Sequence, residues 1–331
     1  MNTHFFRNKR VVVTGGTGMI GRQIVYMLAD LKGEIDLVST SLEAKPPAWP
    51  CSHWSANLIR CSGSALDDLL EGTDVLIHAA GIKAGAKATV ENGAHFLGMM
   101  TELSLRPLVA ARAREVKNVI FVSSIGAYAQ TREERPILEQ YEHDQYASTP
   151  MDLPGWGKRI AEMYVKEVAK ETGWNWSCVR PSNVYGPGDN FNPDTGMVVG
   201  ALLGKVLRGD NPVMVLGDGT ARRDFLYSAD AARGILTVVS ADYRLGHYYN
   251  LGGQNTHSIS ELVEAIRWAT GATFEFSGGA PTYPYRVLDS WRACALGWER
   301  KADLYTGILA AYDWARKNVD VARFDPFSKS S

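Results

Sequence analysis

Thr14-Gly-Gly-Thr-Gly-Met-Ile-Gly21 joins a short apolar run rich in valine to a segment with helical periodicity that extends to Leu31. Gly15 allows a sharp turn, Gly18 allows backbone N–H groups to approach a pyrophosphate, and Gly21 allows the helix to pack close to a sheet. The N-terminus of such a helix favours an anion. The sequence therefore predicts a bound dinucleotide. An ordinary tight connection between a strand and a helix is the alternative.

Apolar runs and helical segments alternate on both sides of this turn. Expected strands are Arg10–Thr14, Glu34–Thr40, Asp74–Ala79, Asn118–Ser123 and Asn175–Arg180, and expected helices include Gly18–Leu31, His95–Ala113 and Gly155–Lys170. This alternation is typical of an α/β fold, here a Rossmann-type doubly wound parallel sheet with helices on both faces.

Proline and glycine cluster after Arg180, and shorter helices and strands follow. We therefore expect a dinucleotide-binding Rossmann domain of residues 1–180, to which about 226–251 return. Residues 181–225 and 252–331 are expected to form a smaller α/β C-terminal lobe that binds the substrate. Ala44–Pro50 is interpreted as a loop, and the tail from Asp325 as frayed.

The composition argues against several classes of function. The 331 residues contain 35 Lys and Arg against 36 Asp and Glu, so no basic field favours nucleic acid or an anionic membrane. No apolar run approaches the roughly 20 residues that cross a bilayer, and the N-terminus lacks a signal-peptide core. The four cysteines show no paired short spacing, which makes a disulfide framework or a metal site a poor interpretation. We expect a soluble cytoplasmic protein.

Five motifs follow one another along the chain. They are Thr14-Gly-Gly-Thr-Gly-Met-Ile-Gly21, His78-Ala-Ala-Gly81, Val122-Ser-Ser-Ile-Gly-Ala-Tyr128, Arg180-Pro-Ser-Asn-Val-Tyr-Gly-Pro187 and Arg222-Arg-Asp-Phe-Leu-Tyr-Ser-Ala-Asp230. In this order they resemble the extended short-chain dehydrogenase/reductase family, the NAD(P)-dependent enzymes that epimerise, dehydrate or reduce nucleotide sugars. Within that family, residues 186–203, 219–226 and 286–298 resemble the GDP-L-fucose synthases. The resemblance implies a nucleotide-sugar substrate, with a GDP-linked 4-keto-6-deoxy sugar favoured, and a homodimer formed through helices His95–Ala113 and Gly155–Lys170.

The resemblance also implies which residues bind the cofactor. They are Gly15, Thr17, Gly18, Met19, Ile20, Gly21, Ser39, Thr40, Ala79, Ala80, Gly81 and Lys158. The place where an acidic side chain would bind the adenosine ribose reads Ser39-Thr-Ser41, and Asp36 lies inside the expected strand. Without a carboxylate a 2′-phosphate is not repelled, although no arginine follows to bind it. We favour NADP narrowly over NAD.

The family's chemistry uses a tyrosine four residues before a lysine, and here only the lysine remains. Lys158 matches that lysine, while Pro154 stands at the tyrosine position. In the family the lysine holds the nicotinamide ribose and lowers the pKa of the phenol, which then exchanges a proton with the sugar. Proline suits the first turn of a helix, so the helix is expected to form without its proton shuttle.

Two serines and two substitutions define the expected sugar site. Ser124 matches the serine that bonds the reacting sugar oxygen, and Ser123 stands beside it, although serines also end strands by bonding local backbone. GDP-L-fucose synthases epimerise two carbons with a cysteine and a histidine, whose positions here hold Ile125 and Met197. Neither side chain can exchange a proton, so we expect the double epimerisation to be lost.

Other polar residues complete the predicted site. The resemblance implies substrate-binding positions at Ser124, Asn183, Lys205, Arg223 and Arg286. The basic residues among them suit the diphosphate of the substrate. A solvated surface charge is the alternative for Lys205. His143 and Tyr146 lie in a polar segment before the Lys158 helix, and either could replace the missing acid.

Two functions agree with these patterns. The first is an NAD(P)-dependent nucleotide-sugar oxidoreductase, epimerase or dehydratase with an atypical active site. The second is a non-catalytic protein of the same fold that binds a dinucleotide and a nucleotide sugar as a sensor or assembly partner. We prefer the enzyme, because the basic residues expected at the substrate are retained although the acid–base residues are replaced.

Overall fold

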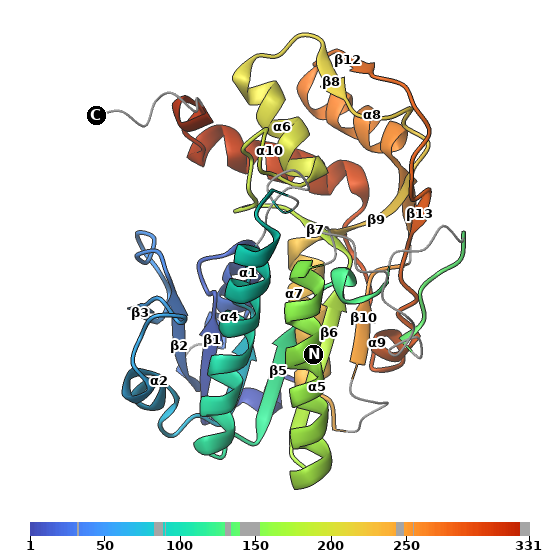
Figure 1. Cartoon of the computed structure of the whole chain (residues 1–331). Coiled ribbons are helices and arrows are strands. Elements are labelled where there is room, and N and C mark those ends of the chain that lie inside the picture. The colour runs from blue at the N-terminus through green and yellow to red at the C-terminus, as the bar shows by residue number, and fades with distance from the viewer. Residues whose placement is uncertain are drawn as a thin grey trace.

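A computed structural model of the chain describes residues 1–31, 33–82, 89, 91–129, 134–139, 153–242, 248–253 and 255–324. Its largest sheet has seven parallel strands in the order β10-β6-β5-β4-β1-β2-β3 (Figure 1). Their bounds are β1 Lys9–Thr14, β2 Ile35–Ser41, β3 Ser52–Ser55, β4 Val75–His78, β5 Asn118–Val122, β6 Asn175–Pro181 and β10 Tyr248–Leu251. The predicted Rossmann-type parallel sheet is confirmed.

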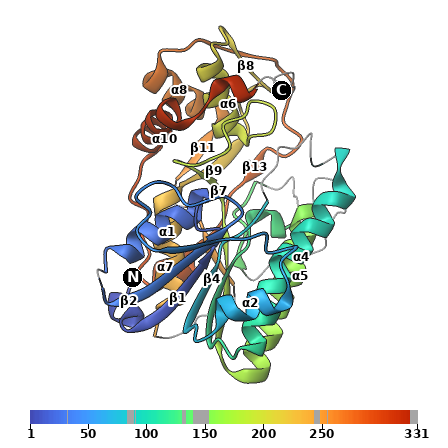
Figure 2. The same ribbon diagram turned by 90° about the vertical axis from the view of Figure 1, so that its left-hand side faces the viewer.

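Helices cover both faces of this sheet (Figure 2). Those with described bounds are α1 Met19–Ala29 and α7 Ser228–Val239 on one face, and α2 Gly63–Leu70, α4 Gly93–Ala113 and α5 Leu153–Thr172 on the other. Val11 and Val13 of β1 belong to the first apolar core, and Val12 belongs to the second. Because both faces are covered, a strand such as β1 is apolar at successive positions rather than alternating.

The remaining elements form a second unit, which we call the small lobe, above the large sheet in Figure 1. In it β9 (Arg222–Tyr227) pairs with β7 (Asn183–Tyr185), β11 (Thr256–Ser258) and β13 (Tyr285–Arg286), and β8 (Val213–Val215) pairs with β12 (Phe274–Phe276). Its helices are α6 Val198–Arg208, α8 Ile259–Thr270 and α10 Leu304–Asn318. Their apolar faces enclose a third core around Leu203, Phe225 and Ile308. The short helix α9 (Trp291–Ala295) packs near β10 instead.

Local sequence accounts for how several of these helices begin and end. Ser258 accepts a hydrogen bond from the backbone of Glu261, whose carboxylate accepts one from the backbone of Ser258, and this capping box starts α8. The same helix ends at Gly271, whose φ of 72° favours glycine. The side chain of Asp303 accepts from the backbone of Thr306 and so caps α10.

Four elements of the large sheet's layers were not predicted, namely β3, β10, α2 and α7, and of these β3 and α2 are short. Strand β3 has four residues, none of them fully buried, and it pairs only with β2 at the sheet's edge. Helix α2 has eight residues and begins at Ser62, whose side chain accepts from the backbone of Ala65. Both are too short for a clear apolar period. His143, Tyr146 and the tail from Asp325 lie outside the described residues. Among the described residues, no helix is long and apolar enough to span a membrane.

Candidate active site

A cavity of about 430 Å³ lies between the carboxyl ends of the large sheet's strands and the small lobe, within the size range of ligand pockets. The turns that follow β1, β4, β5 and β6 line it, together with the first turns of α1, α5 and α6. Eleven of the predicted site residues lie in its wall: Gly15, Gly18, Met19, Ile20, Gly21, Ala79, Gly81, Ser123, Ser124, Lys158 and Asn183. In open parallel sheets this crevice is the usual ligand site.

The glycine-rich turn forms one end of the cavity. Gly15 has a φ of 68°, and a Cβ there would lie 2.8 Å from the backbone of Ala80, so only glycine allows the turns after β1 and β4 to approach so closely. Gly18 is the N-cap of α1 and supplies no side-chain cap, which leaves the first N–H groups of this helix facing the cavity. An uncapped helix N-terminus at a glycine cradle fits the pyrophosphate of a dinucleotide.

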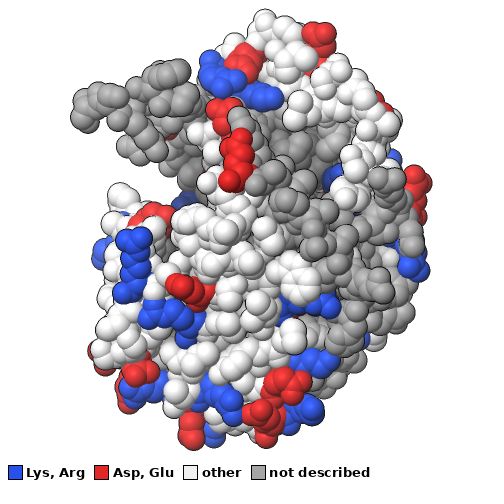
Figure 3. All heavy atoms as spheres, viewed as in Figure 1, with Lys and Arg blue, Asp and Glu red and all other residues white. Residues whose placement is uncertain are grey.

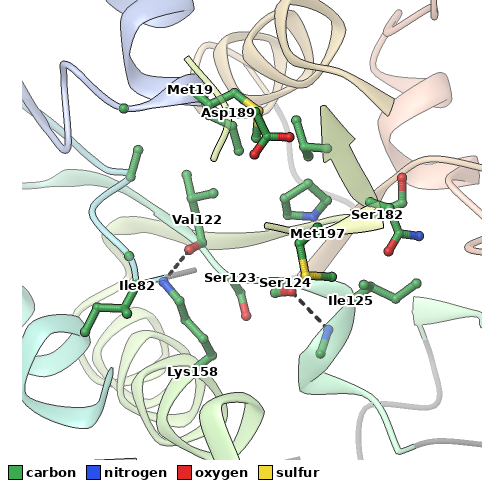
Figure 4. A pocket seen from close by; sticks show the side chains of 18 of the residues that line it. Met19, Ile82, Val122, Ser123, Ser124, Ile125, Lys158, Ser182, Asp189 and Met197 are labelled. Carbon is green, nitrogen blue, oxygen red and sulfur yellow. Dashed lines mark hydrogen bonds between the residues drawn. The ribbon is translucent and has the colours of Figure 1, made fainter. Parts of the chain in front are cut away.

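Ser123 and Ser124 follow β5 and face the same cavity (Figure 4). The hydroxyl oxygen of Ser124 accepts a hydrogen bond from the backbone N–H of Gly126 at 3.0 Å, which leaves its own O–H free to donate. The Ser123 hydroxyl is buried and has no hydrogen-bond partner among the described residues. Because a buried unpaired hydroxyl costs free energy, a ligand oxygen is the natural partner for it.

Lys158 projects from α5 toward the ends of β4 and β5. Its Nζ donates to the carbonyl oxygen of Val122 at 2.9 Å (Figure 4) and lies 3.4 Å from that of Ala80. An ammonium has three N–H donors, so one remains for a ligand. Burial lowers the pKa of Lys158 to about 8. The group is therefore mostly charged at neutral pH and close to its titration point, as an acid–base residue requires.

The first turn of α5 carries the substituted tyrosine position. Pro154 lies in this turn, four residues before Lys158, as expected for a helix that tolerates proline at its start. A Cβ on Gly155 would overlap the carbonyl oxygen of Gly126, and one on Gly157 would lie 3.0 Å from the side chain of Met100. The helix therefore packs tightly on the turn after Ser124 and on α4, and the lysine is held in place without a tyrosine.

Apolar side chains surround the serines. Ile125 and Met197, the two positions at which the resemblance implies replaced acid–base residues, line the cavity (Figure 4). Phe96 and Met100 of α4 extend this apolar wall. A sugar hydroxyl placed against this wall would lose its hydrogen bonds to water and find no replacement there, whereas a methyl group forms no such bonds. The loss of the double epimerisation stays a prediction.

Seven predicted residues do not line the cavity: Thr17, Ser39, Thr40, Ala80, Lys205, Arg223 and Arg286. Ser39 and Thr40 are completely buried, and the Ser39 hydroxyl accepts from the indole N–H of Trp49 at 2.8 Å. The Nζ of Lys205 donates to the carbonyl oxygen of Met214 at 2.7 Å. Their roles in binding remain predictions.

Arg223 and Arg286 face each other in register on β9 and β13. Burial and the neighbouring charge of Arg286 lower the pKa of Arg223. Arg286 also donates through Nη2 to the carbonyl oxygen of Ile125 at 2.9 Å, which ties the small lobe to the turn after Ser124. Two adjacent guanidinium groups that repel each other favour an anion between or beside them.

Glu43 is a candidate site residue that the sequence analysis missed. Its Oε2 accepts from the Thr17 hydroxyl at 3.1 Å, and the Thr17 and Ser41 hydroxyls are 2.8 Å apart. An exposed carboxylate thus stands beside the glycine-rich turn, two residues beyond the end of β2. Only Asp36 and residues 39–41 were considered for this role from the sequence. The signal that could have found Glu43 is an acidic residue shortly after the second strand.

Polar pairs behind the cavity hold its walls. Nε and Nη2 of Arg180 donate to Glu162 at 2.8 and 2.5 Å, both side chains are buried, and this pair joins β6 to α5 one turn after Lys158. His78, at the end of β4, contacts the Thr14 hydroxyl at 2.6 Å. Burial and the charge of Lys158 lower the pKa of His78 to about 3, so this histidine stays neutral and is no proton donor at neutral pH.

Comparisons with known proteins agree with the geometry. The family model described as "NAD dependent epimerase/dehydratase family" matches residues 11–252. A GDP-L-fucose synthase from Azorhizobium caulinodans is 25% identical over 93% of this chain and 96% of its own length. A dTDP-4-dehydro-6-deoxy-D-allose reductase from Streptomyces bikiniensis is 25% identical over 96% of this chain and 100% of its own length. The solved UDP-glucose 4-epimerase of Thermotoga maritima, 24% identical, superimposes with a TM-score of 0.80 over 94% of this chain and 100% of that one. The family match covers most of the large sheet and part of the small lobe, and the chain belongs to this family of NAD-dependent enzymes.

Proposed function

We propose that this enzyme transfers hydride between a nicotinamide dinucleotide and a nucleotide-linked keto sugar, with a GDP-linked 4-keto-6-deoxy sugar as the favoured substrate. The observation that carries the proposal is a single cavity with the glycine-rich turn at one end and Ser123, Ser124 and Lys158 further along its wall. The apolar wall around Ile125 suits a 6-deoxy methyl group. The related proteins carry GDP, dTDP and UDP sugars in their names, so GDP rests on the resemblance to the fucose synthases.

The chain's own residues supply the proton that a phenol would otherwise supply. When bound, the nicotinamide supplies the hydride. The Ser124 hydroxyl donates a hydrogen bond to the carbonyl oxygen of the sugar and stabilises the negative charge that develops there. Lys158 then loses a proton from Nζ to that oxygen, either directly or through a hydroxyl that it holds. Reduction is therefore expected to slow above about pH 8, where Lys158 loses its charge.

We propose NAD rather than NADP as the cofactor. The preference for NADP depended on the absence of a carboxylate near the adenosine ribose. Glu43 now stands beside Thr17 in the glycine-rich turn. A carboxylate there accepts hydrogen bonds from ribose hydroxyls and repels a 2′-phosphate.

The small lobe is proposed to bind the nucleotide sugar. The proposed division stays residues 1–180 with about 226–251, and residues 181–225 with 252–331, except that α9 packs near β10 of the large sheet. Arg223 and Arg286 are assigned to the diphosphate because they face each other in register. Lys205 is the third proposed basic group. Asn183, whose Nδ2 donates to the carbonyl oxygen of Asp224 at 3.1 Å, keeps its amide oxygen for the ligand.

The proposed assembly is a homodimer through α4 and α5. Val109 of α4 is 50% exposed, and Ile160 and Met163 of α5 are 40% and 59% exposed. Much of the face that these two helices present in Figure 3 is uncharged, while charged side chains gather toward its lower end. A second copy would cover these apolar groups in a four-helix arrangement.

The direct test follows nicotinamide absorbance when the protein is mixed with NADH or NADPH and a GDP-4-keto-6-deoxy sugar. Cofactor oxidation that is faster with NADH is expected, together with a loss of about 10²-fold or more in Lys158→Met. Lys170→Met is the matched control, because Lys170 is an exposed lysine near the end of the same helix. A flat trace with demonstrable binding of both ligands would contradict the proposal and favour the non-catalytic sensor.

A further inference from the structure

Arg22 connects the glycine-rich turn to the small lobe, and the proposed reaction does not use it. It follows Gly21 in the first turn of α1. Its Nε and Nη2 donate to the carbonyl oxygen of Thr17 at 3.2 and 2.8 Å. Thr17 is therefore held through its carbonyl by Arg22 and through its hydroxyl by Ser41. The side chain of Arg22 thus helps to fix the backbone of the turn.

The guanidinium of Arg22 packs against two segments of the small lobe. Its Cζ lies 5.1 Å from the ring centroid of Trp314 on α10, within the range of a cation–π contact. A Cβ on Gly188, in the loop between β7 and α6, would lie 3.0 Å from Cζ and Nε of Arg22. Gly188 therefore leaves room for the guanidinium, and both contacts come from residues far from α1 in the sequence.

The loop that contains Gly188 also reaches the cavity. The next residue, Asp189, lines the cavity wall. Two residues further on, Phe191 stacks on Trp314 with ring centroids 5.9 Å apart and an angle of 26° between the rings. A continuous set of contacts thus runs from the cavity wall through this loop to Arg22, and from Arg22 to the carbonyl of Thr17.

We propose that Arg22 is a positioning residue through which a ligand in the small lobe strengthens the binding of NAD at the glycine-rich turn. The proposal rests on the proposed function, which places NAD at that turn. A ligand that orders the loop holds Gly188 and Trp314 against Arg22, and Arg22 then holds the turn in its binding conformation. Such a coupling is reciprocal, so NAD equally strengthens binding in the small lobe.

The test measures the Kd of NAD by calorimetry for the wild type, Arg22→Lys, Trp314→Leu and the double variant. Arg22→Lys is expected to weaken NAD binding about tenfold, because lysine lacks the flat fork that donates two N–H groups and stacks on an aromatic ring. Trp314→Leu is expected to weaken it about threefold or more, although Trp314 does not line the cavity. The double variant is expected to be no weaker than Arg22→Lys alone, because both changes break one connection.

Two matched controls and two nucleotide probes complete this test. Trp268→Leu removes an exposed tryptophan of the same lobe, and Arg7→Lys changes an exposed arginine of the other, so both are expected to leave the Kd unchanged. Saturating GDP, with UDP as the second probe, is expected to tighten NAD binding of the wild type about fivefold or more, and that of Arg22→Lys by less than about twofold.

Each outcome separates the coupling from the proposed function. A wild type that binds no NAD overturns the proposed function, and the coupling with it. A wild type that binds NAD overturns the coupling alone if Trp314→Leu keeps the wild-type Kd, if the two substitutions act additively, or if a bound GDP or UDP leaves the Kd unchanged. If Trp314→Leu fails to fold, Trp314→Phe replaces it, since phenylalanine keeps the stack on Phe191 and weakens the cation–π contact.

Discussion

Lys158 shows how the environment of one residue gives it a new chemical property. Two carbonyl oxygens hold its Nζ, and burial among the ends of β4 and β5 lowers its pKa from 10.5 to about 8. The family resemblance implied Lys158, Ser123 and Ser124 as site residues, and all three line the same cavity. The pKa could not be predicted in the same way, because it depends on burial by strands that are distant in the chain.

The lowered pKa of Lys158 predicts how stability depends on pH. Between about pH 8 and the unfolded value of 10.5, the unfolded chain binds one more proton at this lysine than the folded chain does. The free energy of unfolding is therefore expected to gain a positive contribution as pH rises through this window. Denaturant unfolding at several pH values is expected to show this contribution in the wild type and in Lys170→Met but not in Lys158→Met. An identical slope in all three proteins would contradict it.

Glu43 sets the proposed choice of cofactor by its charge. Glu43→Gln keeps the size of the side chain and its contact with the Thr17 hydroxyl but removes the charge that repels a 2′-phosphate. The ratio of kcat/KM for NADPH to that for NADH is expected to rise about tenfold, which corresponds to about 1.4 kcal/mol. Glu34→Gln changes another exposed carboxylate, which pairs with Arg7, and is the control. An unchanged ratio in Glu43→Gln would contradict the assignment of the cofactor preference to Glu43.

Residues such as Glu43 and Arg22 show where prediction from the sequence stops. The glycines of the turn were predicted because their role depends on the backbone next to them. Glu43 contacts the turn from a loop, and Arg22 contacts Trp314, which lies almost three hundred residues away in the sequence. The contact of Arg22 leaves no local pattern, so only the folded chain shows it, whereas the local signal of Glu43 is only an acidic residue shortly after β2.

At the level of elements, the residues that fold and pack helix α5 are different from the tyrosine that acid–base chemistry would use. Its first turn contains Pro154, its close contacts use Gly155 and Gly157, and its buried pair uses Glu162. None of these features needs a tyrosine. The helix therefore forms at the expected place, and its lysine lines the cavity.

Pro154→Tyr is predicted to restore a proton donor. Residue 154 lies one helical turn before Lys158 on the same face, so a phenol there is expected to approach the sugar site, with its pKa lowered by the lysine. The rate of ketoreduction is expected to rise about 10²-fold or more. Pro154→Phe adds the same ring without the hydroxyl and is the matched control. Equal rates in the two variants would show that the phenol takes no part in proton transfer.

Some elements could be predicted from the sequence and others could not. Strands β1, β4 and β5 are apolar at successive positions because helices cover both faces, and this pattern was visible. Strand β3 is a short edge strand with no such pattern, and β7, β9 and β13 of the small lobe join through residues far apart in the chain. The pairing of these strands depends on contacts that form only in the folded chain.

For the whole molecule, the proposed dimer makes a separate prediction. Met163→Glu places a charge at an exposed methionine of α5, and burial of that charge in a dimer interface would be costly. The variant is expected to be monomeric by light scattering, while Met214→Glu, an exposed methionine of the small lobe, stays dimeric. A wild-type protein that is already monomeric would contradict the proposed assembly.

The buried pair of Glu162 and Arg180 also determines how the molecule opens. Separation of α5 from β6 would break this pair and expose buried apolar side chains of both elements, such as Val165 and Trp176, to water. Amide hydrogens in the middle of α5 and β6 are therefore expected to exchange with deuterium only through global unfolding, whereas those of the edge strand β3 exchange through local opening. Mass spectrometry of exchanged peptides measures this difference, and equal rates would contradict it. The lysine of the site is thus attached to an element that is expected to open only when the whole molecule unfolds, so its geometry is expected to persist between successive turnovers.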